Sequence, residues 1–141
     1  MTTIAWDGKT LAADRRVSYG SISDAKTTKI AKTKHGLCGA CGNSSLGAAF
    51  KRWFQNGEKG DPPPLEKGGE TATAFIIRSA GVRLHYDQWG WYEADPGPFA
   101  IGSGYEIAIG AMESGKSAVE AVKTAAKLDG YTSDEIDILE L

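Results

Sequence analysis

The sequence predicts a layered α+β fold in which antiparallel strands and helices occupy separate blocks. Short strand-like segments joined by tight turns dominate residues 2–41 and 71–104, whereas helical spacing is confined to residues 44–55 and 105–128. This order favours an α+β sandwich over a doubly wound parallel sheet, in which strands and helices alternate. A chain of 141 residues can bury a core of its own, so we expect one domain over residues 1–141.

The N-terminal block is predicted to consist of hairpins. Segments 2–6 and 9–14 flank Asp7-Gly8, and an Asp-Gly pair favours a type I′ turn between two strands. We expect residues 15–21 to continue this sheet, and residues 29–33 and 36–40 to form a second hairpin. Apolar residues come in runs as well as in alternation, which is typical of strands covered on both faces.

A helix is predicted over residues 44–55, because Leu46, Phe50 and Trp53 recur at helical spacing and Asn43 and Ser44 can cap its first turn. Residues 56–69 then contain three consecutive prolines and several glycines, which exclude regular structure there. We expect a surface loop in this segment.

The second half is predicted to repeat the order of strands followed by helices. Strands are expected at residues 71–79, 82–88, 89–95 and 98–104, where β-branched and aromatic residues are frequent. Helices are expected at 105–114 and 117–128, separated at Ser114-Gly115 and closed by Asp129-Gly130. Residues 135–141 alternate in polarity and predict a closing strand.

The composition excludes several classes of partner. Sixteen basic and eighteen acidic residues give a net charge of -2 without long charged runs, so we expect no nucleic-acid or anionic-membrane binding. No segment approaches the roughly 20 apolar residues of a membrane span, and the N-terminus lacks a signal-peptide pattern. The sequence therefore predicts a soluble, cytoplasmic protein.

One motif offers a nucleotide-binding alternative. Gly110–Ser117 matches the phosphate-loop pattern G-x-x-x-x-G-K-[ST], in which Lys116 would reach phosphates and Ser117 would hold magnesium. Only 24 residues follow it, too few for the further strand–helix units of a parallel sheet. The competing interpretation is a junction between two helices, with Ser114 or Ser117 as a cap.

The pair Cys38 and Cys41 offers a redox alternative, since a C-x-x-C pair before a helix can be reactive. The surrounding pattern of a thioredoxin-like unit is missing, and two small buried cysteines are the ordinary interpretation. His35 and His85 are the only histidines and no second cysteine pair exists. We therefore expect no metal site and no cofactor.

The N-terminus offers a third chemistry. If Met1 is removed, Thr2 carries a free α-amine and a β-hydroxyl on the same residue. An α-amine has an ordinary pKa of about 7.7–8.0, so it can serve as general base for the neighbouring hydroxyl at working pH. The sequence thus allows an N-terminal threonine nucleophile.

Six blocks, taken in order, resemble the proteasome β subunits and the related bacterial peptidase HslV, which are N-terminal-nucleophile hydrolases. The blocks are TTIAW, LAADRRVSYG, TKIAKT, LCGACGN, FAIGSG and KLDGYTSDEIDI. The resemblance implies a four-layer αββα sandwich of two antiparallel sheets. Relative to that family, one helix of the first helical layer is reduced to the loop at residues 56–69.

The resemblance also implies roles for individual residues. Thr2 matches the nucleophile, Lys29 the lysine beside it, and Asp14 the acidic residue that orients this lysine. The backbone N–H of Gly39 matches the oxyanion donor, and a glycine there would let the substrate backbone approach closely. The residues that match the group around the amine are Ser103, Asp129 and Thr132. The positions that match the substrate pocket are Ser18 or Tyr19, Ser21, Thr28 and the Gly42-Asn43 region.

By the same resemblance, the chain is expected to be a threonine endopeptidase that encloses its sites in a homo-oligomeric ring. Its substrate would be a peptide or an unfolded protein, with an ATPase unfoldase as a possible partner. While Met1 remains attached, Thr2 has no free amine. The alternative is therefore a catalytically inactive structural or assembly protein of the same type.

Overall fold

A computed structural model describes residues 2–20 and 22–141, without the side chains of residues 23 and 24. The chain divides into two compact units, which are described separately here. Unit 1 contains the chain up to Thr28 together with Gly97–Glu140, and unit 2 contains Lys29–Pro96. The expectation of one domain stays a prediction.

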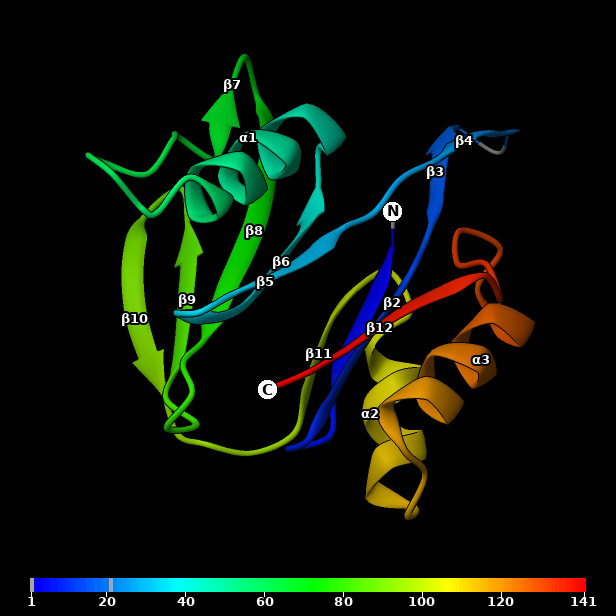
Figure 1. Cartoon of the computed structure of the whole chain (residues 1–141). Coiled ribbons are helices and arrows are strands. Elements are labelled where there is room, and N and C mark those ends of the chain that lie inside the picture. Colours follow the sequence, from blue (N-terminus) through cyan, green and yellow to red (C-terminus); the bar gives the residue numbers. More distant parts are fainter. Residues whose placement is uncertain (1, 21) are drawn as a thin grey trace. The chain divides into compact units, whose positions relative to one another are not determined.

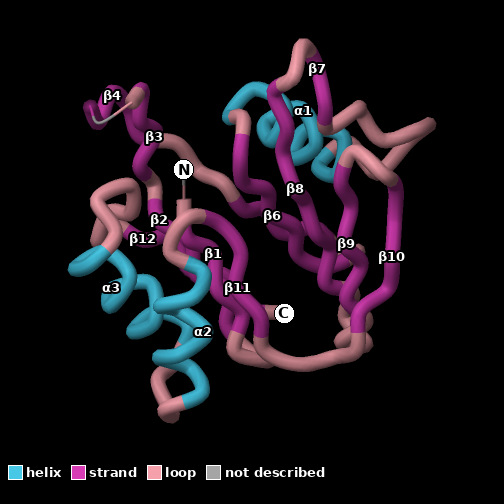
Figure 2. Tube along the Cα trace, turned by 180° about the vertical axis from the view of Figure 1, so that it is seen from behind, coloured by secondary structure: helices cyan, strands magenta, loops and turns pink. Residues whose placement is uncertain are grey.

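Unit 1 is built on an antiparallel sheet with the strand order β11-β1-β2-β12 (Figure 1). Its strands are β1 (Thr3–Trp6), β2 (Thr10–Asp14), β11 (Phe99–Gly102) and β12 (Ile136–Glu140). Helices α2 (Tyr105–Glu113) and α3 (Ala118–Leu128) pack together against this sheet, as the reverse view in Figure 2 also shows. The core between helices and sheet consists almost wholly of alanine, with Val122 as its one larger buried member among the described residues.

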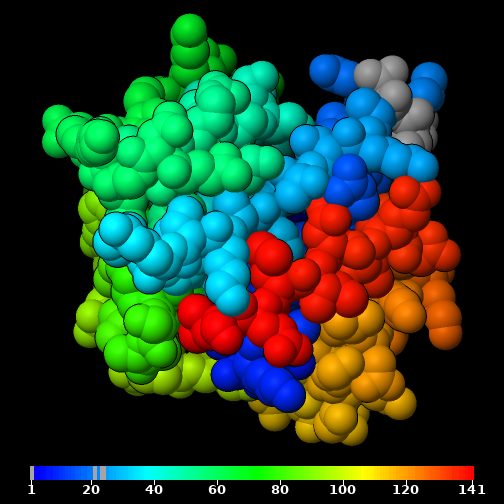
Figure 3. Space-filling view, in the orientation of Figure 1, coloured from blue at the N-terminus to red at the C-terminus, as the bar shows by residue number. Residues whose placement is uncertain are grey.

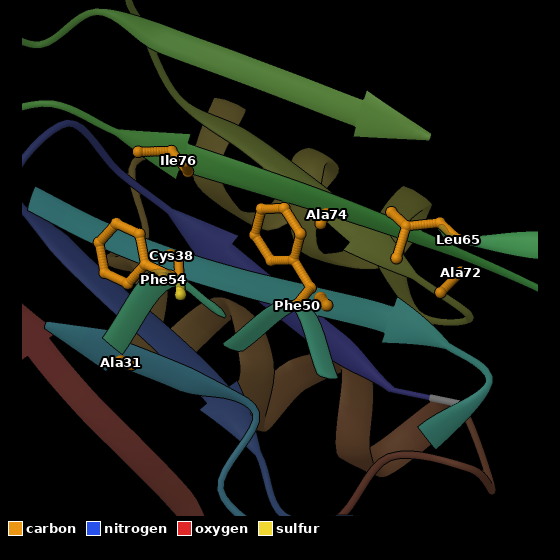
Figure 4. Close-up of a cluster of buried hydrophobic side chains, with 9 residues drawn as sticks. Ala31, Cys38, Phe50, Phe54, Leu65, Ala72, Ala74 and Ile76 are labelled. Carbon is orange, nitrogen blue, oxygen red and sulfur yellow. The ribbon is translucent and has the colours of Figure 1, made fainter. Parts of the chain in front are cut away.

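Unit 2 is built on an antiparallel sheet with the order β10-β9-β8-β6-β5. Its strands are β5 (Ile30–Thr33), β6 (Gly36–Gly42), β8 (Glu70–Ile77), β9 (Arg83–Asp87) and β10 (Gly90–Ala94). Helix α1 (Ser44–Gln55) lies on this sheet and packs Phe50 and Phe54 against the face formed by β6 and β8 (Figure 4). Asn43 caps the helix as expected, since its Oδ1 accepts the N–H of Ser45 and Leu46.

Aromatic side chains cover the β9–β10 side of unit 2. Tyr86 and Trp91 stack with centroids 4.5 Å apart, and Trp53 of α1 lies 6.3 Å from Trp91. The indole N–H of Trp53 donates to the carbonyl of Gly60, which ties the proline-rich loop to α1. Leu65, from the end of that loop, is buried in the same core as Phe50. Large side chains and a fixed loop thus cover this part of the sheet. The family resemblance led us to expect a loop here in place of a helix.

Three local predictions were wrong. The turn after β1 is centred on Gly8-Lys9, because Asp7 N–H bonds the Thr10 carbonyl, and Gly8 (φ 99°) is the residue there with positive φ. Neither Asp7 nor Lys9 has a positive φ, so the two successive positive-φ residues that a type I′ turn needs are missing. Asp7 shapes this turn because its Oδ1 accepts the N–H of both Lys9 and Thr10.

The prediction that residues 15–21 continue the first sheet is wrong for the described residues 16–20. Strand β3 (Arg16–Tyr19) pairs with β4 (Ile22–Lys26) in a separate two-stranded sheet. The reason is a hydrogen bond at Asp14, whose Oδ2 accepts the Arg16 N–H. This N–H is therefore not available for pairing in the first sheet. In the proline-rich segment, β7 (Glu66–Lys67) pairs with β8, so residues 56–69 are not wholly irregular.

Candidate active site

The buried carboxylate of Asp14 gathers four donors at the end of β2. Its Oδ1 accepts the hydroxyl of Thr2 and, at 2.9 Å, the N–H of Thr3. Its Oδ2 accepts the N–H of Arg16 and of Ser133, each at 3.1 Å. Asp14 is fully buried and Thr2 is 2% exposed. A buried carboxylate requires such donors, and here they fix the Thr2 side chain at the start of the central strand β1.

A second carboxylate organises the hydroxyl groups of this region. Asp129, at the C-terminal end of α3, accepts the hydroxyls of Ser103 at 2.5 Å and Thr132 at 2.7 Å on its Oδ2. Burial alone would raise the pKa of Asp129, but the hydrogen bonds from Ser103, Thr132 and the Tyr131 N–H outweigh it and hold the pKa below its usual value. Asp129 is therefore ionised at neutral pH.

The network continues to Thr3, which sequence reasoning missed. The Oγ1 atoms of Thr3 and Thr132 are 2.7 Å apart. Since Thr132 uses its only hydroxyl hydrogen for Asp129, Thr3 must be the donor in this contact. Thr3 is fully buried on β1, so it links the strand that carries Thr2 to the loop after α3. The sequence signal that could have indicated Thr3 was its place directly after Thr2.

Two glycines allow Ser103 to approach this network. A Cβ at Gly102, whose φ is 100°, would lie 1.9 Å from the Thr2 carbonyl oxygen, and a Cβ at Gly104 would lie 2.2 Å from Thr3 Oγ1. Either contact is far below van der Waals distance. The G-S-G turn is thus required by close packing against Thr2 and Thr3, and it brings Ser103 Oγ within 3.4 Å of the Thr2 carbonyl.

Lys29 and Gly39 belong to unit 2. Lys29 directly precedes β5, and its carbonyl accepts the Ala40 N–H at 3.4 Å. Gly39 lies on β6 opposite Ile30 and Phe75. A Cβ at Gly39 would lie 2.6 Å from the Phe75 ring, so a larger residue there would have to displace this buried ring. This is a different reason from the substrate approach that the sequence suggested.

The expected pocket positions are spread over both units. In unit 1, Tyr19 on β3 is 71% exposed, and the Thr28 hydroxyl accepts a hydrogen bond from Arg15 at 2.8 Å. Ser21 lies outside the described residues. In unit 2, Gly42 ends β6 with a φ of 100° and leads into the Asn43 cap. The roles of these positions stay predictions.

The phosphate-loop match has a different structure from a nucleotide site. Its first residues form the last turn of α2, and Ser117 caps α3. The Ser117 Oγ accepts the Glu120 N–H while Glu120 Oε1 accepts the Ser117 N–H, which is a capping box. The motif is therefore a helix–helix junction and not a strand–loop–helix unit.

The cysteine pair is also not arranged for redox chemistry. Cys38 and Cys41 are free thiols, and burial raises their pKa to about 12 and about 11. A reactive thiol needs a lowered pKa. Within residues 2–20 and 22–141, no group of three or more His, Cys, Asp or Glu side chains is placed to hold a metal ion. In the same part of the chain, no helix is long and apolar enough to cross a membrane.

Comparison with solved structures identifies the fold. BPH of Thiobacillus denitrificans in complex with epoxomicin superposes with a TM-score of 0.70 over 99% of this chain and 98% of its own, at 18% identity. Eukaryotic HslV from Trypanosoma brucei gives a TM-score of 0.67 over 98% and 97%, at 17% identity. The chain has the HslV fold. A further BPH structure agrees, with a TM-score of 0.70, 18% identity and coverage of 99% and 97%.

The HslV fold confirms the fold class expected from the sequence, an α+β architecture with antiparallel sheets of the N-terminal-nucleophile hydrolase type. No family model and no curated protein matches the sequence itself. The likeness thus lies in the arrangement of the elements, over nearly the whole length of both chains.

Proposed function

We propose that this chain is a threonine-type endopeptidase whose nucleophile is Thr2 after removal of Met1. The observation that carries the proposal is the hydrogen bond from the Thr2 hydroxyl to the buried Asp14. It stands beside a network of Ser103, Asp129 and Thr132 that reaches the first strand. Four of these five residues match the family positions in type and order, and Thr132 keeps the hydroxyl at a position where the family usually has serine, on a chain with the HslV fold.

The proposed reaction is acyl transfer. The Thr2 hydroxyl proton, which Asp14 accepts in the structure, turns to the amine freed by loss of Met1, and this amine takes it directly or through a water. Thr2 Oγ1 then attacks the peptide carbonyl. The amine then gives the proton to the departing peptide nitrogen, which leaves an ester on Thr2. Water adds to the ester with the same amine as base, and the carboxylic acid product is released.

The other residues have supporting roles in this proposal. The Lys29 ammonium stabilises the alkoxide that develops on Thr2, and the Gly39 N–H stabilises the oxyanion. The ionised Asp129 and its hydroxyl donors hold the region around the amine. The first substrate side chain would contact Tyr19, Ser21, Thr28 and Gly42.

An unprotected site of this kind would cleave proteins indiscriminately. We therefore propose a cytoplasmic homo-oligomeric ring that encloses the sites, takes peptides or unfolded proteins, and has an ATPase unfoldase as a possible partner. A stable monomer at micromolar concentration by mass photometry would contradict the ring.

The decisive experiment is intact mass spectrometry before and after treatment with a peptide epoxyketone. Such an inhibitor forms its ring adduct only with an N-terminal residue that offers both a hydroxyl and a free amine. We expect loss of Met1 and one adduct per chain, with the adduct kept in Thr2→Ser and absent from Thr2→Ala. Retention of Met1, or processed chain without adduct, favours the inactive assembly protein instead.

A further inference from the structure

A cavity of about 650 Å³ opens in unit 1 beside helix α3. It is lined by Arg16 of β3, by Lys123, Ala126 and Lys127 of α3, and by the loop residues Thr132, Ser133 and Asp134. Figure 3 shows the orange-red loop that contains residues 129–135 at the surface next to α3. The cavity size is typical of sites for small organic molecules, roughly 300–1,000 Å³.

The charge of the cavity lining is opposite to that of the whole chain. Three cationic side chains face one carboxylate, Asp134, whereas the complete sequence has a net charge of -2. Lys123 and Lys127 are four residues apart on α3, where two like charges disfavour the helix. Lys127 in the last turn is favoured by the helix dipole, but Lys123 lies one turn too early for this effect.

Neighbouring cations differ from these two lysines in their partners. Lys26 pairs with Glu135 at 2.5 Å and Arg15 with Asp137 at 2.8 Å. No ion pair in the described part of the chain involves Lys123 or Lys127. Their ammonium groups can therefore accept an anion without breaking an existing pair.

Two backbone carbonyls hold the Arg16 side chain at the cavity. Its Nη1 donates to the carbonyls of Gly130 at 2.8 Å and Thr132 at 3.4 Å. These carbonyl acceptors fix the guanidinium group and satisfy part of its donors. One positive charge of the cavity is thus set in place before any ligand arrives, which lowers the entropy cost of binding.

We propose that this cavity is a binding site for a small phosphate-bearing molecule with at least two negative charges. The surplus of two positive charges matches a phosphate dianion, and lysine ammonium groups bind phosphate as point charges. The volume leaves room for an organic part or a second phosphate. Ser133 adds a hydroxyl next to these cations.

The site is linked to Asp14 through the backbone. Both Arg16 and Ser133 line the cavity, and both donate their N–H to Asp14 Oδ2. A ligand that draws these two residues together alters the carboxylate that holds the Thr2 hydroxyl. This link to reactivity rests on the proposed peptidase function, whereas binding itself does not.

The test is titration with pyrophosphate by isothermal calorimetry at constant ionic strength. The double variant Lys123→Gln/Lys127→Gln removes two cavity charges, and Lys9→Gln/Lys116→Gln removes two exposed unit 1 lysines that do not line the cavity. We expect wild type to bind pyrophosphate, the cavity variant to bind at least about tenfold more weakly, and the control to change by about twofold or less. Thermal unfolding checks that both variants are folded.

Further arms identify the ligand and separate the two proposals. Inorganic phosphate and glycerol phosphate, titrated in parallel, distinguish a free phosphate from an ester. No pyrophosphate binding at millimolar concentration, or equal losses in both double variants, overturns the site. An unchanged rate of epoxyketone adduct formation with pyrophosphate bound overturns only the link to Thr2, and failure of all adduct formation leaves the binding result intact.

Discussion

The two units differ in the size of the side chains that pack their helices against their sheets. Between α2, α3 and their sheet, unit 1 buries Ala5, Ala12, Ala108 and Ala121 with little else. In unit 2, α1 buries phenylalanines together with Leu65 and Ile76 (Figure 4). Small side chains allow backbones to approach closely, whereas large ones stabilise through the apolar area that they bury.

This difference follows the distribution of polar groups. Unit 1 contains the buried network of Thr2, Thr3, Asp14 and Thr132, and such groups need partners at fixed distances. A close-packed alanine core fixes α3, and with it Asp129, against the strand that carries Thr3. Unit 2 has one helix over its sheet in the described residues and compensates with aromatic area. Close packing that fixes polar groups is thus a feature of unit 1, and a large buried apolar area is a feature of unit 2.

The largest expected effect is truncation in the aromatic core. Phe54→Ala removes a fully buried ring that packs near Cys38 and Ile76, and we expect a loss of about 3–5 kcal/mol in the free energy of unfolding. Urea unfolding measures it. The matched change in unit 1, Ala121→Gly, should cost only about 1 kcal/mol. Equal losses would contradict the contrast between the cores.

Substitutions that enlarge a buried side chain should cost more stability in the alanine core of unit 1 than in the aromatic core of unit 2. Ala121→Leu adds three carbons to the fully buried seam between α3 and the sheet, and we expect about 1–3 kcal/mol of destabilisation from overpacking. Lys127→Leu, exposed on the same helix, is the control for helix propensity and should be near neutral. A stable Ala121→Leu protein would show that unit 1 is loosely packed.

Thr3→Val tests the network without changing side-chain volume. The variant loses the hydroxyl that donates to Thr132 and leaves that oxygen short of a partner, so we expect a loss of about 1–2 kcal/mol. The control is Thr10→Val, whose hydroxyl bonds Glu140 at the surface. Under the proposed function, Thr3→Val also slows epoxyketone adduct formation, and Thr10→Val does not.

The smallest expected effect concerns pH. Because the folded pKa of Asp129 is lowered from 3.8, its ionised form stabilises the fold above that value, and this contribution is lost as pH falls through the lower folded pKa. Asp129→Asn should therefore be less stable than wild type by about 1 kcal/mol at neutral pH. The difference should shrink in strong acid. A difference that grows on acidification would contradict the direction of this pKa shift.

Elements with local signals were predictable from the sequence. Helix α1 has the predicted bounds because Asn43 caps it, and α3 begins after Ser117 because that residue forms a capping box with Glu120. Strand β7 was missed because its two residues are extended only through pairing with β8. The turn at Asp7 was misassigned because its side chain takes both turn amides and also caps α3 through the Ala118 N–H.

In the candidate site, too, residues with a local sequence signal were predicted, and residues that depend on distant partners were missed. The sequence blocks singled out Asp14, Ser103, Asp129 and Thr132, whose roles stay predictions. The structure connects these residues by hydrogen bonds around the first two threonines. Thr3 was missed since its partner is 129 positions away along the chain. The reason for glycine at position 39 was likewise hidden, because Phe75 comes from another strand.

The order of strands in unit 1 has a consequence for synthesis on the ribosome. Strand β1 is translated before the other strands of its sheet, yet one of its two neighbours is β11 at residues 99–102, and the edge strand β12 at residues 136–140 pairs with β2. Unit 2, apart from Leu141, is the continuous stretch Lys29–Pro96, so it is translated before β11 and β12 of unit 1. The hydrogen-bond network around Thr2 can therefore form only after Ser133 has been translated, because Ser103, Asp129, Thr132 and Ser133 all belong to it.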